Sequence, residues 1–172
     1  MLRLTSLAII CSALSAGAHA DVRDTDRERV LGLPQPRPAL ALPKGDWTIQ
    51  REQRRDGGTA VYYHLASDKT KLNFSVYIDK TTACSDADGC LKAALENKSY
   101  KEAKEMSVSS SGPFKVAAFF LDQPAGLPIQ QAHVLASAYV EGVWFDIHIS
   151  LAGKERPELA PLLELLKTVE LR

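Results

Sequence analysis

The sequence lacks any apolar run long enough to cross a bilayer, which takes about 20 consecutive apolar residues. Its main apolar stretch, residues 4–14, is shorter and lies at the N-terminus. It also lacks a Gly-rich phosphate loop, a Gly-x-Ser-x-Gly motif and a His-Glu-x-x-His motif. We therefore expect no retained membrane anchor, and no motif assigns a reaction or a cofactor.

The sequence also has no excess of basic charge. It carries 21 Lys and Arg residues against 21 Asp and Glu residues. Removing residues 1–20, whose only charged side chain is Arg3, leaves 20 against 21, a net charge of −1. Nucleic-acid-binding domains usually carry a basic excess or stripe. The nearest feature is Arg51, Arg54 and Arg55, which a solvated edge strand explains equally well, so we expect no nucleic-acid partner.

The N-terminus has the three parts of a secretory signal peptide. Arg3 supplies the positive charge, residues 4–14 the apolar segment, and Ala18-His19-Ala20 the small-x-small cleavage site. The lipoprotein alternative would place a lipid on Cys11, but the preceding Ile10 is larger than the residues typical of such signals. The pattern predicts a signal peptide over 1–20, a mature chain from Asp21, and export to the periplasm or the medium.

Only two cysteines follow residue 20, Cys84 and Cys90. Exported proteins meet an oxidising compartment, so an intrachain disulfide is the expected state. A redox-active pair more often has the spacing Cys-x-x-Cys, whereas five residues separate these two. A metal or redox role is the alternative.

Residues 21–43 differ in composition from the rest of the chain. A densely charged segment is followed by four of the nine prolines: Pro34, Pro36, Pro38 and Pro43. Because proline cannot donate to a helix or a sheet ladder, the composition predicts a Pro-rich flexible linker over 21–43. A proline-rich recognition motif is the alternative. A single α+β domain is expected over 44–172.

Apolar periodicity predicts the elements of that domain. Strands are expected at 47–55, 59–66, 72–79, 114–121, 130–140 and 143–151. Helices are expected over 88–106 and after Pro157, with Val169 and Leu171 in a short last strand. The order β-β-β-α-β-β-β-α predicts an α+β fold with one mostly antiparallel sheet.

This plan resembles the Mog1/PsbP-like fold, a family of small α/β/α sandwiches. The resemblance covers about residues 42–171. It depends on the segment Leu42-Pro43-Lys44-Gly45-Asp46-Trp47, the β-β-β-α half that follows, and the Tyr139–Leu151 hairpin before the last helix. It implies a sandwich fold and an accessory or assembly role, and it carries no shared catalytic set onto this chain.

The hairpin around Glu141-Gly142 gathers polar side chains on one sheet face, because side chains alternate along a strand. With a two-residue loop, Tyr139 lies opposite Trp144 and Ser137 opposite Asp146. The candidate binding face consists of His133, Ser137, Tyr139, Trp144, Asp146 and His148. An outer face that merely meets water is the alternative.

Hydrolytic and metal chemistry are the two enzymatic alternatives for these polar residues. A hydrolase would use Ser137 as nucleophile with His148 or His133 as base, but nucleophiles usually stand on sharp turns beside an oxyanion hole. A zinc site at His133, Asp146 and His148 would need three or four converging ligands. Separately, a calcium loop at Asp86 and Asp88 lacks two key carboxylates, and helix capping accounts for both residues. No catalytic residue, metal ligand or cofactor is assigned.

The sequence thus favours an exported, monomeric, non-enzymatic accessory or binding protein. The partner is an unknown protein or small ligand, and an immunity or inhibitor protein is one specific form. The alternative is a small hydrolase or metal-dependent enzyme that uses the 133–150 face.

Overall fold

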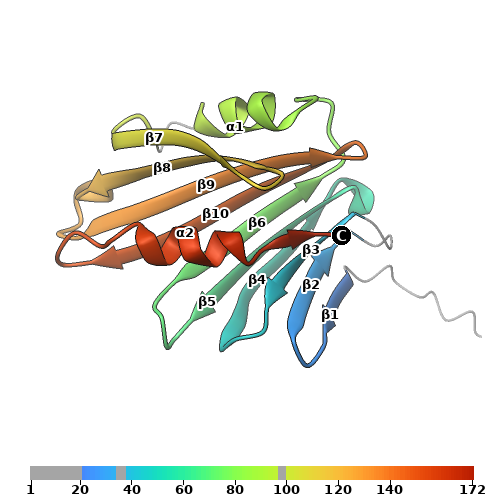
Figure 1. The fold of residues 1–172 in the computed structure, drawn as a ribbon, viewed down its shortest axis with the longest axis horizontal. Helices are drawn as coiled ribbons and strands as arrows, with labels where there is room; N and C mark the ends of the chain where they lie inside the picture. Colours follow the sequence, from blue (N-terminus) through green and yellow to red (C-terminus); the bar gives the residue numbers. More distant parts are fainter. Residues whose placement is uncertain (1–20, 34–37, 97–99) are drawn as a thin grey trace, which may run out of the picture.

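The computed structural model describes residues 21–33, 38–96 and 100–172. Within these residues the fold is mostly β: eleven strands form two antiparallel sheets, and there are two short α-helices (Figure 1). The expected α+β sandwich is therefore wrong. No helix in the described ranges is both long and apolar enough to span a membrane.

The larger sheet has seven strands in the order β4-β5-β6-β10-β9-β8-β7. Its strands are β4 (Trp47–Arg55), β5 (Ala60–Ser67), β6 (Asn73–Asp79), β7 (Lys104–Ser111), β8 (Phe114–Asp122), β9 (Gln130–Val140) and β10 (Val143–Gly153). The central strand β10 pairs with β6 on one side and β9 on the other. Its unbroken apolar alternation from Val143 to Leu151 is therefore the strand signal that the structure confirms most fully.

The smaller sheet has four strands in the order β1-β2-β3-β11. Its strands are β1 (Asp21–Asp24), β2 (Glu28–Gly32), β3 (Ala39–Pro43) and β11 (Glu170–Leu171). The C-terminus closes this sheet, because the backbones of Ala39 and Arg172 exchange two hydrogen bonds of 2.7 and 2.9 Å.

The smaller sheet corrects the expectation of a flexible linker over 21–43. Leu31, Leu40 and Leu42 are completely buried and belong to the main core. The prolines misled the prediction: Pro43 ends β3, and Pro38 lies just before it. Pro34 and Pro36, like the predicted signal peptide, lie outside the described residues.

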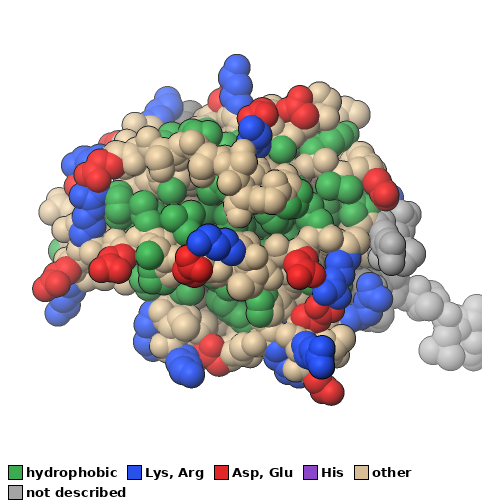
Figure 2. All heavy atoms as spheres, in the orientation of Figure 1, with side chains coloured by type: hydrophobic (Ala, Val, Ile, Leu, Met, Phe, Trp, Pro, Cys, Tyr) green, Lys and Arg blue, Asp and Glu red, His purple; other side chains and the backbone are tan. Residues whose placement is uncertain are grey.

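Helix α2 (Ala160–Lys167) and the smaller sheet cover the same face of the larger sheet. The core between them includes Phe145 and Ile147, both 0% exposed. The Tyr63 hydroxyl crosses this core and donates to the Gly32 carbonyl at 3.0 Å, which ties β5 to β2. On this side of the molecule, hydrophobic side chains gather in the strip between α2 and β7 (Figure 2).

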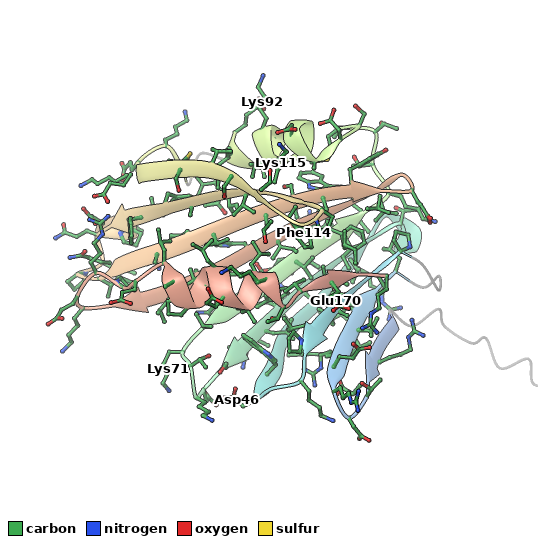
Figure 3. All side chains as sticks on the ribbon, viewed as in Figure 1. Asp46, Lys71, Lys92, Phe114, Lys115 and Glu170 are labelled. Carbon is green, nitrogen blue, oxygen red and sulfur yellow. A yellow bond between two sulfur atoms is a disulfide. The ribbon has the colours of Figure 1, made fainter. Side chains whose placement is uncertain are left out.

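Helix α1 (Ala87–Leu95) packs on the opposite face, against β8, β9 and β10. Asp86 caps it by accepting from the Gly89 backbone N–H at 2.7 Å. Cys84 and Cys90 lie at disulfide distance, with Cα atoms 5.1 Å apart, and fasten the loop before α1 to its first turn. The Lys115 ammonium lies 3.2 Å from Asp88, and Figure 3 shows Lys115 beside α1.

The predicted helix over 88–106 is too long, because α1 ends at Leu95. The last part of the predicted helix and the residues that follow it belong instead to β7 (Lys104–Ser111). Seven of the eight residues of β7 are exposed, and the strand is held by backbone pairing to β8. An exposed edge strand has no buried face, so it produces no apolar alternation in the sequence.

Candidate functional site

The candidate binding face lies on the side of the larger sheet that carries α1. The β9–β10 register confirms the predicted pairs, Tyr139 with Trp144 and Ser137 with Asp146. Glu141 and Gly142 both have positive φ, as a tight two-residue hairpin loop requires. We call this side the polar face, and in β5 and β6 it continues through Tyr62, His64, Ser75 and Tyr77.

Helix α1 and the ring of Tyr100, which packs against Phe119 and His148, divide the polar face into a covered and an open half. The covered half consists of β8, β9 and β10, where Leu91 of α1 packs on Phe119 and Leu135. Ser137 is 0% exposed and His133 is 5% exposed. Tyr139, Trp144, Asp146 and His148 are partly buried. The six predicted residues therefore share one face, but they do not form one exposed surface.

The two predicted histidines of the covered half form a buried pair. His133 Nδ1 and His148 Nε2 are 2.7 Å apart, and His133 Nε2 lies 3.0 Å from Gln131 Oε1. Because Gln131 Oε1 can only accept, His133 carries its proton on Nε2, and His148 Nε2–H donates to His133 Nδ1. His133 is neutral in this arrangement, because its Nδ1 accepts a hydrogen bond.

Aromatic rings enclose the histidine pair. His133 stacks on Phe119 with ring centroids 5.2 Å apart, and His148 meets the edge of Tyr100 at 6.0 Å. Burial lowers the pKa of His133 to about 4. Burial, followed by the neighbouring His133 and His64, lowers the pKa of His148 to about 3. The pair therefore resists protonation at neutral pH.

Asp146 lies in the same row as Tyr77 on β6 and Ser137 on β9. Its Oδ1 atom is buried and has no hydrogen-bond partner among the described residues. Burial raises the pKa of Asp146 to about 6. The pKa of Tyr100 rises to about 12 because of burial and then of the charges of Asp146 and Tyr62.

The arrangement gives little support to the hydrolase or metal chemistry considered from the sequence. The Ser137 side chain is inaccessible in mid-strand, and its Oγ lies 3.5 Å from the Trp144 indole Nε1. The facing nitrogens of His133 and His148 bind each other. Across the described ranges, no three His, Cys, Asp or Glu side chains are placed to hold a metal ion together.

The open half consists of β4, β5 and β6, and it contains a hollow of about 350 Å³. Its lining residues are Arg51, Gln53, Arg55, Tyr62 and Tyr77. We call this hollow the Arg–Tyr pocket. None of the five belonged to the predicted site, although the alternation of Arg51, Gln53 and Arg55 along one strand already placed them on one face.

The histidine pair and Asp146 together predict a pH dependence of stability. With unfolded pKa values of about 6.5 for His and 3.9 for Asp, unfolding between pH 6 and 4 takes up two protons on the histidines and releases one from Asp146. One net proton corresponds to about 1.4 kcal/mol per pH unit, lost as pH falls. We expect the free energy of unfolding to be about 3 kcal/mol lower at pH 4 than at pH 6.

Urea denaturation at pH 4, 5, 6 and 7 measures this dependence. The double variant His133→Leu/His148→Leu removes the histidine contribution and keeps that of Asp146, so its stability should fall clearly less than that of the wild type between pH 6 and pH 4. Asp146→Asn removes the group that releases a proton on unfolding. Its free energy of unfolding should therefore fall more steeply with falling pH than that of the wild type. Parallel pH profiles for the wild type and the double variant would show that the pair is not responsible.

The chain matches no protein-family model, and no curated protein is significantly similar to it in sequence.

Proposed function

We propose that this chain is an exported, non-enzymatic binding protein whose ligand occupies the open half of the polar face. The observation that carries the proposal is the Arg–Tyr pocket, about 350 Å³ in volume, beside the part of the sheet that α1 covers. Ligand sites are typically concave, with an apolar lining and a few converging polar groups. Tyr62 and Tyr77 supply the rings, while Arg51, Gln53 and Arg55 supply the polar groups.

Two further features support a rigid binding scaffold. The pocket lies on paired strands rather than on loops, because β5 is hydrogen-bonded to β4 and β6 along its length. Asp46 accepts from the Ser67 hydroxyl and the Lys69 backbone N–H, both at 2.7 Å, which orders the turn from β5 to β6. Figure 3 shows Asp46 and Lys71 together at that end of the sheet. A site held on strands keeps its shape before a ligand arrives.

The test is an NMR titration of ¹⁵N-labelled protein 21–172. The titrant is the ultrafiltered small-molecule fraction of the compartment to which the protein is exported. We expect the amide signals that move to cluster on β4, β5 and β6. Tyr62→Ala should abolish the shifts because it removes one wall of the pocket. Tyr139→Ala is the matched control, a partly buried tyrosine on the same face but outside the pocket. Shifts confined to the groove of Leu91, Leu95 and Val108, or none at all, would contradict the proposal.

A further inference from the structure

We propose that the Arg–Tyr pocket binds an organic anion, whose carboxylate or phosphate group is held by Arg51 and Arg55 and whose apolar part lies on Tyr62 and Tyr77. This inference rests on the proposed function and adds the chemical class of the ligand. Four observations support it: the placement of the two arginines, their lack of carboxylate partners, the tyrosine pair, and the distribution of acids on the polar face.

Strand alternation separates the arginines of β4. Arg51, Gln53 and Arg55 line the pocket, whereas Arg54 lies on the other side and pairs with Glu52 at 3.2 Å. Residues 51 and 55 are about 13 Å apart along a strand, a gap that two arginine side chains can close. Arg51 Nη2 donates to Gln53 Oε1 at 2.8 Å, which turns its guanidinium along β4 toward Arg55.

The two pocket arginines differ in their partners from several other arginines of the described chain. Arg29, Arg54, Arg156 and Arg172 are each paired with a carboxylate. Within the described part of the chain, neither Arg51 nor Arg55 forms an ion pair. A guanidinium presents a planar set of N–H donors that matches the oxygens of a carboxylate or phosphate. Among the described side chains, the pocket therefore presents two cations that have no carboxylate partner.

The tyrosines supply the other half of the recognition surface. Tyr62 and Tyr77 are register partners on β5 and β6, so their side chains are neighbours across the strands. Both are partly buried and line the pocket. A planar or apolar group bound to the anion can pack on these rings, which adds contact area at little entropic cost.

The acids of the polar face do not cancel the arginine charges at the pocket. Asp79 lies in the row of Arg55, with Ala60 of β5 between them. Asp146 lies one strand further from β4, beyond Tyr77. Neither carboxylate lines the pocket. The local charge at the pocket is therefore positive although the whole chain is nearly neutral, and this favours an anionic ligand.

The experiment titrates protein 21–172 with benzoate, benzamide, phenyl phosphate and acetate, followed by NMR shifts on β4, β5 and β6. Benzoate or phenyl phosphate should bind at least about tenfold more tightly than neutral benzamide, since a charge-assisted pair contributes about 1.5–3 kcal/mol. The stronger of the two identifies the anionic group. Acetate, which lacks the ring, should bind more weakly than benzoate.

Single variants assign the effect to the two arginines. Arg51→Gln and Arg55→Gln should each weaken benzoate binding several-fold, while Arg54→Gln, on the same strand but outside the pocket, should leave it unchanged. Equal binding of benzamide and benzoate, or equal loss in Arg54→Gln, would overturn the anion inference and leave the proposed function standing. If neither the probes nor the extract shift signals on β4 to β6, both proposals fail.

Discussion

A chain that begins at Lys44 should not fold, whereas the chain that begins at Asp21 should. The shorter chain lacks β1, β2 and β3, and with them the buried side chains of Leu31, Leu33, Leu40 and Leu42. Loss of one buried leucine side chain typically costs about 2–5 kcal/mol. Four such losses match or exceed the stability of about 5–15 kcal/mol that a domain has in total.

Far-UV circular dichroism and NMR signal dispersion of the two chains measure this difference. A point variant gives the same comparison without truncation: Leu40→Ala in protein 21–172 should lower the free energy of unfolding by about 2–5 kcal/mol. Arg27→Ala, at an exposed position between β1 and β2, is the control and should change it little. If protein 44–172 unfolded cooperatively at the same melting temperature as protein 21–172, residues 21–43 would be a linker after all.

Replacing Phe145 with alanine should lower the free energy of unfolding by about 3–5 kcal/mol. Phe145 is 0% exposed and lies on the central strand β10, between Ile78 of β6 and Ala138 of β9. Its ring belongs to the core that α2 and the smaller sheet share. This core is packed between the larger sheet on one side and α2 with the smaller sheet on the other. We therefore expect the cavity left by the missing ring to persist rather than collapse.

The neighbouring Trp144→Ala is the matched control for Phe145→Ala. Trp144 is also a large aromatic residue of β10, but its side chain lies on the polar face and is only partly buried. In urea denaturation, Trp144→Ala should lower the free energy of unfolding by less than half as much as Phe145→Ala does. A nearly neutral Phe145→Ala beside a severe Trp144→Ala would mean that the two faces of β10 are exchanged.

The buried histidine pair changes how the predicted binding face should be tested. On an exposed binding face, a change at His148 would affect binding and spare stability. In the structure His148 lies under Tyr100 and bonds to His133, so its removal opens a cavity and leaves His133 Nδ1 without its donor. Variants of Arg51, Arg55 and Tyr62 separate binding from folding better, because these side chains line an open pocket.

Strand positions with strong alternation could be predicted from the sequence. The β9–β10 hairpin, its register and the buried face of β10 follow from the apolar alternation over 143–151 and the Glu141-Gly142 turn. The capped start of α1 and the Cys84–Cys90 pairing also follow from local residues. Each of these features depends on side chains close in sequence, and local patterns report on such contacts.

Only the tertiary structure decided the rest. Residues 21–43 carry no alternation that separates a strand from an extended linker, and they become a sheet because β11 and the core face of the larger sheet lie beside them. The exposed edge strand β7 leaves no apolar pattern because it has no buried face, and only its pairing with β8 makes it a strand. The Arg–Tyr pocket joins β4, β5 and β6, while α1 buries His133 and Ser137 on the same face. Which polar residues face water and which are covered depends on contacts between distant segments, and a single strand pattern holds no information about those contacts.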